Sequence, residues 1–313
     1  MPASKPNVVA LVAQMPETDR DIQLKQEEAK AKAQPDSPDK PKPKADRAGT
    51  ASKFTGPDPA AAEKIFAEIL SGGRESIVEL LGLVREPGDA DFKDYKAGYV
   101  LHGLVILSGQ AGQEKQRRLL AETLASQLSS DRHSKAVKGF MIRELRLLGG
   151  RDAVNVLGAQ LLDEDLSSDA TQALLTIRDG VAPQFRDALK KASGRTRVPL
   201  IQALGILQDT DSSATLRKVF SDDDRGVRQM AAWSLANIGD PDSAELLLNA
   251  AGTAQGWERI EATRVCLLLA DRLAATKQQA AAIRIYSHLR DTLNGSNERH
   301  IRDTAEKALT GRD

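Results

Sequence analysis

The stretch Arg228–Leu247 is the part of this chain that most resembles a chemical site. It reads RQMAAWSLANIGDPDSAELL, with Trp233 inside a run of small residues and the carboxylates Asp240 and Asp242 on either side of a proline. Two carboxylates this close in sequence are candidates for a catalytic dyad. The alternative is that they belong to a structural turn of a repeated unit. A catalytic dyad occurs once in a chain, whereas a turn of this kind recurs, so repetition elsewhere in the sequence decides between the two interpretations.

Other residue types that could carry chemistry are few and scattered. The chain has one cysteine, Cys266, which excludes an intramolecular disulfide, a cysteine metal cluster and a CxxC redox pair. Cys266 lies in an apolar helical run, where a cysteine usually acts as a small buried hydrophobe. The histidines lack the HxH or HxxxH spacing of a zinc site; they are His102, His133, His288 and His300. With no GxSxG, GxGxxG or phosphate-binding loop, we predict no catalytic residue, metal or cofactor.

The composition limits the class of protein. Lys and Arg together number 44, as do Asp and Glu, so no net basic field is available to recruit nucleic acid or acidic lipid. Aromatic residues make up only 4% of the chain, and Ala and Leu are abundant, which favours helices packed through small and aliphatic side chains. No run approaches the roughly 18 apolar residues of a membrane span.

Residues 1–54 differ in composition from the rest. They are rich in Lys, Pro, Asp and Ala, with four prolines in PDSPDKPKPK, and they offer little apolar surface to offset the entropy of ordering. We expect a disordered tail that tethers or steers the folded part. The short apolar run Asn7–Ala13 leaves a signal-peptide remnant, and therefore export, as a minority alternative to a cytoplasmic location.

Beyond the tail, the chain is a series of short helices with an internal repeat. Four helical stretches align on one leucine each, with successive separations of 29, 30 and 31 residues; the leucines are Leu145, Leu174, Leu204 and Leu235. Mostly apolar residues recur eight and four places before each leucine and three places after it, which places them on one helix face. A second short apolar helix follows each of these stretches. Two helices per fixed period are typical of an α-solenoid.

The unit at residues 222–250, DDDRGVRQMAAWSLANIGDPDSAELLLNA, resembles the short subclass of HEAT repeats known as PBS-lyase-like repeats. The resemblance lies in the Asp-rich turn, the Val-Arg pair, the Ala-rich helix, the Gly-Asp-Pro turn and the second helix. It extends over residues 134–251. Residues 256–293 resemble longer tetratricopeptide helices, and residues 296–310 the first helix of another HEAT unit. The resemblance implies an all-α fold over residues 55–313: an α-solenoid of antiparallel helix pairs in a right-handed superhelix.

The repeat gives the carboxylates of the opening stretch a structural interpretation. Five places after the leucine stand Asp179, Asp209 and Asp240, and seven places before it stand Arg197 and Arg228. Stacking of units would bring these positions together, so we expect a ladder of Asp–Arg contacts, with Asp caps at helix N-termini. HEAT units commonly carry such a ladder. Because the motif recurs, it is interpreted as structural rather than catalytic.

Trp233 does not recur, because the equivalent positions in the other units carry Arg143, Gln172 and Gln202. At about 100° per residue, Trp233 points away from the buried face of its helix. Two interpretations remain open. The indole lies against a neighbouring element such as the N-terminal tail, or it is an exposed anchor for a partner, since Trp is enriched at interface hot spots.

These features favour a non-enzymatic interaction scaffold, of bacterial origin and monomeric, that binds a protein or peptide partner on the concave face of a solenoid. The resemblance to HEAT proteins implies that the second helix of each unit lines that face. Besides Trp233, the residues that we expect to bind a partner are Asn155, Gln160, Gln184, Lys218, Glu245 and Asn249.

Two other classes of function remain open. Short HEAT repeats of this kind occur in bilin lyases and as helper modules of larger enzymes, so an accessory or regulatory module of such an enzyme system is the first alternative. A DNA-binding HEAT-like solenoid is the second, but it needs a basic concave groove. The equal numbers of acidic and basic residues argue against nucleic acid as a partner.

Overall fold

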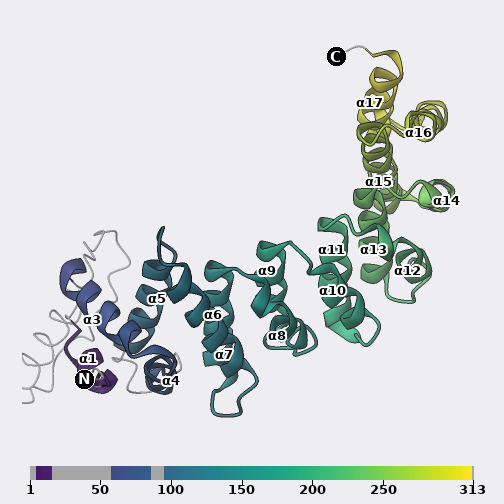
Figure 1. Ribbon diagram of the computed structural model, residues 1–313. Helices are drawn as coiled ribbons and strands as arrows, with labels where there is room; N and C mark the ends of the chain where they lie inside the picture. The colour runs from purple at the N-terminus through teal and green to yellow at the C-terminus, as the bar shows by residue number, and fades with distance from the viewer. Residues whose placement is uncertain (1–4, 16–57, 86–94, 312–313) are drawn as a thin grey trace, which may run out of the picture. The chain divides into compact units, whose positions relative to one another are not determined.

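The computed structural model describes residues 5–15, 58–85 and 95–311, and every regular element within them is a helix (Figure 1). The prediction of an all-α solenoid built from helix pairs is confirmed. None of the helices in these ranges combines the length and apolarity that a membrane crossing needs. The chain divides into two compact units, Met1–Val137 and Lys138–Asp313.

The N-terminal unit consists of two layers of helices. Its helices are α1 (Val8–Ala13), α3 (Pro59–Ser71), α4 (Gly73–Leu83), α5 (Lys96–Ser108) and α6 (Glu114–Leu128). In one layer α3 packs against α5, and in the other α4 packs against α6. The start of α3 agrees with its sequence, because Asp58 accepts a hydrogen bond from the Ala60 N–H and Pro59 occupies the first helical position.

Helix α1 corrects the expectation of a disordered tail over residues 1–54. Val8, Leu11, Val12 and Met15 are buried, and α1 packs against α3, α4 and α5. A six-residue helix is too short to be stable alone, so this tertiary packing is what holds it. The run that resembled a signal-peptide remnant is therefore part of the core of this unit. The rest of the predicted tail, residues 16–54, lies outside the described residues.

The C-terminal unit repeats one arrangement of helix pairs. Helix α7 (Lys135–Leu148) contains the boundary between the units. The first helices of the pairs that follow are α9 (Ser167–Ile177), α11 (Arg197–Ile206), α13 (Arg225–Ile238), α15 (Gly256–Ala275) and α17 (Arg299–Thr310). The second helices are α8 (Val154–Ala159), α10 (Ala182–Leu189), α12 (Ser213–Val219), α14 (Ala244–Thr253) and α16 (Gln279–Thr292).

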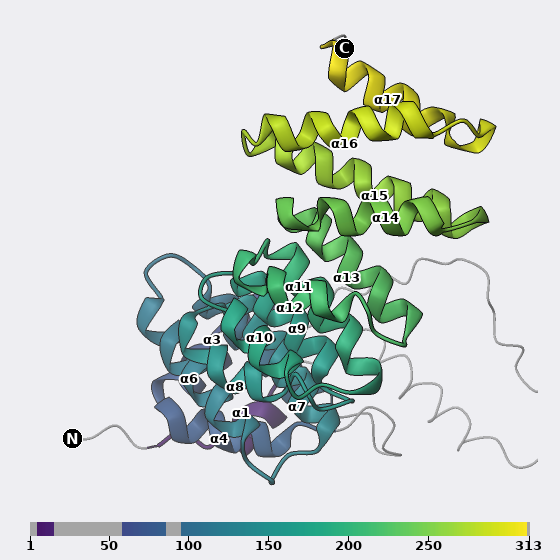
Figure 2. The same cartoon turned by 90° about the vertical axis from the view of Figure 1, so that its right-hand side faces the viewer.

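First and second helices form two layers within this unit. Successive first helices pack side by side, from α9 to α17, and each second helix packs on the first helix that follows it in the chain. Figure 1 shows α13, α15 and α17 in one column with α12, α14 and α16 beside them, and Figure 2 shows α16 and α17 following α14 and α15 at the end of the stack. Short 3-10 turns precede the second helices α8, α12 and α14 and the first helices α11 and α17; in chain order they are Arg151–Ala153, Gly194–Thr196, Thr210–Ser212, Pro241–Ser243 and Ser296–Glu298.

The repeat read from the sequence matches the core of these helices. The four repeat leucines are each 0% exposed, and the residues four and eight places before them are also buried. The residue four places after each leucine has a positive φ; these residues are Gly149, Arg178, Gln208 and Gly239. This position follows the end of the helix, where a left-handed residue lets the chain turn and glycine is favoured.

Arg178 occupies this turn at an energetic cost. Its φ of 60° and ψ of −47° place it in a tight γ-turn, in which the Asp179 N–H donates to the Ile177 carbonyl oxygen at 2.7 Å. This conformation is rare and strained for a residue with a Cβ. The repeat pattern, in which Gly149 and Gly239 stand at the equivalent position, indicates glycine as the residue that removes the strain.

An Asp–Arg ladder is present, but its partners differ from those the sequence predicted. Asp209 accepts from Arg186 at 2.7 Å, and Asp240 accepts from Arg217 at 2.5 Å. Asp179 pairs with Arg151. The arginines therefore come from the second helix or turn of the preceding unit, because the acidic turn of each unit lies against that element rather than against a first helix.

The arginines that were expected to form the ladder have other roles. Arg197 donates to the Asp222 carboxylate at 2.6 Å, and Arg228 donates to the main-chain oxygens of Asp222 and Asp223. The expected Asp cap is present at Asp224, whose side chain accepts from the Val227 N–H at the start of α13. In Asp209 and Asp240 the carboxylate also accepts from the serine three residues later, Ser212 or Ser243.

Replacing Arg178 by glycine is expected to raise the free energy of unfolding by about 1 kcal/mol, because glycine adopts a positive φ without steric cost. Urea unfolding followed by circular dichroism measures the change. The control is Gln172→Gly, an exposed position inside the same helix, where glycine is expected to lower stability by about 1 kcal/mol. Equal destabilisation by both variants would show that the Arg178 backbone is not strained.

The buried ion pair Arg217–Asp240 is expected to contribute more to the free energy of unfolding than the exposed pair Arg151–Asp179. The Asp240 side chain is 8% exposed, so Arg217→Met leaves a buried carboxylate without its cation and should lower the free energy of unfolding by about 2–3 kcal/mol. Arg151→Met breaks a pair whose side chains are 73% and 67% exposed, and should cost at most about 0.5 kcal/mol. Urea midpoints of the two variants, compared with the parent chain, test this difference.

Candidate functional site

The site begins with a close contact between α11 and α13. A Cβ on Gly205 of α11 would lie 2.8 Å from the Cα of Ser234, so only glycine allows the two helices to approach this far. The Ser234 hydroxyl donates to the Ile201 carbonyl oxygen, and the Asn237 amide donates to the Gly205 carbonyl oxygen, both at 2.8 Å. Ser234 and Asn237 are buried, and these bonds fix the position of α13 on α11.

The same asparagine connects α13 to α15. Arg272 of α15 donates to the Asn237 side-chain oxygen at 2.7 Å, and its Cβ lies 3.4 Å from the position a Cβ on Gly239 would take. These contacts hold the C-terminal ends of α13 and α15 together. Towards their N-terminal ends, side chains of residues 225–233 and 257–265 line an open groove instead.

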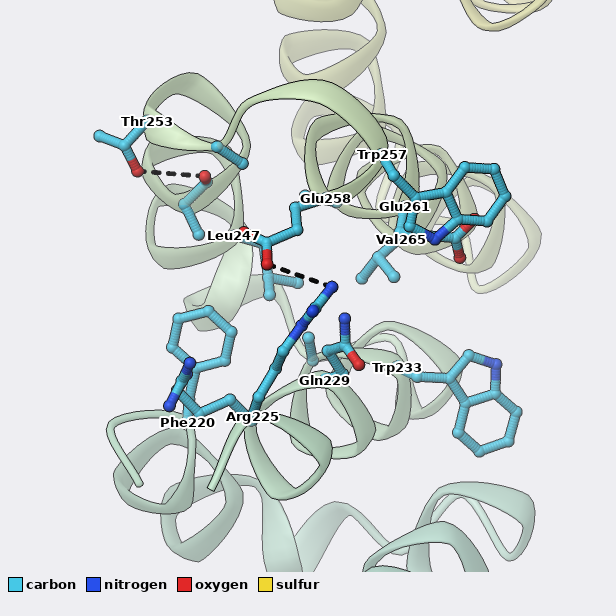
Figure 3. A pocket seen from close by; sticks show the side chains of 15 residues that line it. Phe220, Arg225, Gln229, Trp233, Leu247, Thr253, Trp257, Glu258, Glu261 and Val265 are labelled. Atoms are coloured by element: carbon cyan, nitrogen blue, oxygen red, sulfur yellow. Dashed lines mark hydrogen bonds and ion pairs between the residues drawn. The ribbon is translucent and has the colours of Figure 1, made fainter. Parts of the chain in front are cut away.

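The groove has a volume of about 630 Å³ and lies between α13, α14 and α15 (Figure 3). Its lining residues are Phe220, Arg225, Arg228, Gln229, Ala232, Trp233, Leu247, Ala250, Thr253, Ala254, Trp257, Glu258, Glu261, Ala262 and Val265. Phe220 and Leu247 lie at one end, and the two indoles at the other (Figure 3). A volume of this size is in the range of ligand-binding clefts.

Both tryptophans of the chain line this groove. Trp257 is 64% exposed, the largest value among the exposed large hydrophobic residues, and Trp233 is partly exposed. Figure 3 shows Trp257 on the α15 wall and Trp233 on the α13 wall, with Val265 between the walls. The guanidinium of Arg264 lies 5.9 Å from the centroid of the Trp257 ring, a cation–π distance.

Opposite charges face each other across the groove. Arg225 and Arg228 belong to the α13 wall, and Glu258 and Glu261 belong to the α15 wall. Arg225 Nη2 lies 3.1 Å from Glu258 Oε1, and Figure 3 shows this ion pair bridging the two walls. Both side chains of the pair are 55% exposed, so the bridge is weak and open to exchange with other charged groups.

Of the residues that the sequence proposed for partner binding, only Trp233 lines the groove. Gln184 donates to the Asn155 side-chain oxygen at 3.0 Å, and Gln160 donates to the Val156 carbonyl oxygen at 3.4 Å. The other three residues are exposed on second helices; they are Lys218, Glu245 and Asn249. These six residues therefore lie outside the groove, and their role in binding stays a prediction.

Sequence reasoning missed Trp257, which is 64% exposed at this site. Trp257 lies after Leu235, the last of the four aligned leucines. The comparison of equivalent repeat positions that singled out Trp233 therefore did not include it. A signal was present: Trp257 and Arg264, seven places apart, share the face of α15 that also carries Glu261. An indole on a polar helix face, in a chain with 4% aromatic residues, indicates an exposed contact residue.

The cysteine and the tyrosine with shifted pKa values, Cys266 and Tyr286, do not line the groove. Cys266 is buried in the core beside it, and this burial raises the pKa of its thiol to about 12, which keeps the thiol protonated at neutral pH. Burial, together with a hydrogen bond to Asp271, raises the pKa of Tyr286. In the described ranges no three His, Cys, Asp or Glu side chains are placed to hold a metal ion.

Comparison with known proteins assigns part of this unit to a family. The family model for HEAT repeats matches residues 182–267, which run from α10 into α15. This segment consists of HEAT repeats. The HEAT match contains every residue that lines the groove and reaches past residue 251, into the segment that resembled tetratricopeptide helices. No curated protein sequence matches the chain.

Two solved structures are similar in fold. One is the complex of CpcE and CpcF of phycocyanin lyase from Nostoc sp. PCC7120, with 17% identity and a TM-score of 0.36, covering 75% of this chain and 94% of that chain. The other is human deoxyhypusine hydroxylase in complex with glycerol, with 14% identity and a TM-score of 0.30, covering 76% of this chain and 97% of that chain. Similarity at this level supports neither an activity nor a ligand here.

The hydrogen bonds of Asn237 are expected to stabilise the HEAT segment that carries the groove. Asn237→Ala removes one of the two hydrogen bonds to the Gly205 carbonyl oxygen, which keeps the Gln208 N–H, and takes the Asn237 partner from the Arg272 guanidinium; it should lower the free energy of unfolding by about 2 kcal/mol. Asn249→Ala, at an exposed position on α14, should change it by less than about 0.5 kcal/mol. Urea unfolding of both variants measures the difference. Equal free energies of unfolding for the two variants would show that the Asn237 hydrogen bonds do not stabilise this segment.

Proposed function

We propose that this chain is a non-catalytic scaffold that binds a protein partner through the groove between α13, α14 and α15. One observation carries the proposal: both tryptophans of the chain line this groove, and Trp257 is 64% exposed. An exposed indole costs solvation free energy in the free protein and is among the most effective anchors in protein interfaces. A partner that covers Trp257 would recover that free energy.

A protein partner fits this groove better than a small molecule does. The groove is open, and its walls carry two arginines, two glutamates and two indoles. Small-molecule sites enclose most of their ligand and use few polar groups, whereas protein interfaces combine aromatic anchors with a charged rim. The proposed partner therefore contributes apolar side chains that meet the indoles and charged side chains that meet the walls.

The surface formed by second helices is a further part of this proposal. Lys218, Glu245 and Asn249 are exposed on α12 and α14, where the sequence placed the concave binding face. A large partner would contact both surfaces, with the groove supplying the anchor. Service as an accessory module of an enzyme system is compatible with this role, because such a module also acts by binding a protein.

Loss of the Trp257 indole is expected to weaken partner binding strongly without unfolding the chain. The experiment captures partners on immobilised full-length chain from an extract of its source cells, with Trp257→Ala beside the parent. Because interface hot-spot residues contribute about 2 kcal/mol or more, capture should fall about 30-fold. Truncation of an exposed side chain should change the free energy of unfolding by less than about 0.5 kcal/mol.

The matched control is Ile283→Ala on α16, which truncates another exposed hydrophobic residue of the same unit, 46% exposed and outside the groove. It should retain every partner. Equal capture by parent and Trp257→Ala chains would contradict the proposal. A nucleic acid found in place of a protein, released by salt, would favour the DNA-binding alternative.

A further inference from the structure

We propose that the groove between α13 and α15 binds an amphipathic α-helix of the partner, with an apolar stripe between one acidic flank and one basic flank. This inference rests on the proposed function and specifies the chemistry of the partner. It follows from three features of the groove: the state of its backbone groups, its length, and the separation of charge between its walls.

The backbone of the groove walls favours a helix over an extended peptide. Residues 228–233 and 261–265 lie inside α13 and α15, where main-chain N–H and C=O groups bond within their own helix. An extended peptide that entered would bury its own main-chain groups with few partners, at a cost of about 1–3 kcal/mol for each unpaired group. A helix enters with these groups already paired, as in other helix-in-groove complexes.

The length of the groove suits a short helical segment. Each wall presents five side chains from a span of nine residues, 225–233 on α13 and 257–265 on α15. At 1.5 Å per residue this corresponds to about 13 Å, or roughly two and a half helical turns. Over that length a partner helix presents its apolar stripe to Trp233, Trp257 and Val265.

Charge complementarity determines the flanks of the partner helix. The α13 wall is basic, with Arg225 and Arg228, and the α15 wall is acidic, with Glu258 and with Glu261, whose carboxylate Arg264 of the same helix contacts at 2.8 Å. An acidic flank would face the arginines, and a basic flank would face the glutamates. Arg225 and Glu258 already form an exposed pair across the groove, so a partner with both charges exchanges this pair for two new ones.

Like charges on both flanks would leave one flank against a wall of its own sign. A helix with two acidic flanks meets Glu258 and Glu261, and one with two basic flanks meets Arg225 and Arg228. Each arrangement replaces attraction by repulsion along one wall. The groove therefore selects for mixed flanks. Turning the helix end for end exchanges its flanks, so a given mixed-flank helix meets opposite charges on both walls in one direction only.

The tryptophans make the test specific, because the intrinsic Trp fluorescence of the chain reports on this groove alone. The probes are synthetic peptides of about 18 residues without Trp or Tyr, which share one Leu/Ala stripe. They differ in their flanks, as Glu/Lys, Glu/Glu or Lys/Lys, and a fourth peptide has the Glu/Lys flanks with two central prolines. Emission wavelength and iodide quenching of the full-length chain are followed during titration at low salt.

The Glu/Lys helix should shift Trp emission to the blue, protect Trp257 from iodide, and bind about tenfold more tightly than either like-charged peptide. The proline-containing peptide should bind at least about tenfold more weakly, since two prolines prevent the helix. Equal binding by the proline peptide would show that the groove takes an extended segment. No saturable change with the Glu/Lys helix would overturn the proposal.

Charge reversal on one wall gives the sharpest control. Glu258→Arg cancels the net negative charge of the α15 wall, where Glu261 remains, so the preference for the Glu/Lys over the Glu/Glu peptide should be lost. Glu245→Arg makes the same change at an exposed residue of α14 outside the groove and should leave the preference unchanged. A change of preference with Glu245→Arg instead would place the helix on the second-helix surface and overturn the assignment to the groove.

The outcomes separate this inference from the proposed function. If Trp257→Ala abolishes capture of a protein partner but no helical peptide binds, the groove binds a partner of another shape and only the helix inference fails. If the Glu/Lys peptide binds but Trp257→Ala retains every partner, the proposed function of the groove fails. Self-association of the chain at rising concentration, lost with Trp257→Ala, would identify a second copy as the occupant and also overturn the inference.

Discussion

The hydrogen bonds of Asn237 hold together the part of the chain on which the candidate site depends. Asn237 lies between two neighbours, donating to the Gly205 carbonyl oxygen of α11 and accepting from Arg272 of α15. A hydrogen bond requires its two atoms to lie within a narrow range of distance, so both neighbouring helices are fixed relative to α13. The absence of a side chain at Gly205 is what allows α11 to come close enough.

The groove lies at the opposite end of the same helices from this contact. The hydrogen bond between Arg272 and Asn237 joins α13 and α15 near their C-terminal ends. Towards their N-terminal ends, side chains of the two helices line the groove. The sequence places a basic pair on one of these halves and an acidic pair on the other, with one tryptophan on each. A structural contact and a functional surface are therefore properties of the same two helices, at opposite ends.

Much of the fold follows from local pattern. The repeat leucines predicted the buried face because a helix with apolar residues at a 3.6-residue period must cover that face. The N-cap at Asp224 and the turn at Gly239 could also be predicted from the sequence, because each depends on the conformation of a few adjacent residues. The helix at Val8–Ala13 was not predicted, because six apolar residues gain stability only from helices more than 40 residues away in the chain.

The sequence by itself determined the repeat, the helical class, the buried leucines and the structural nature of the recurring carboxylates. Only the tertiary structure decided which arginine each aspartate meets, and that Trp233 and Trp257, from successive first helices, line one groove. The physical reason is the range of the interactions. Periodicity and capping act within one or two helical turns, whereas partners across a stack depend on how closely the helices approach, which a few buried groups such as Gly205 and Asn237 set.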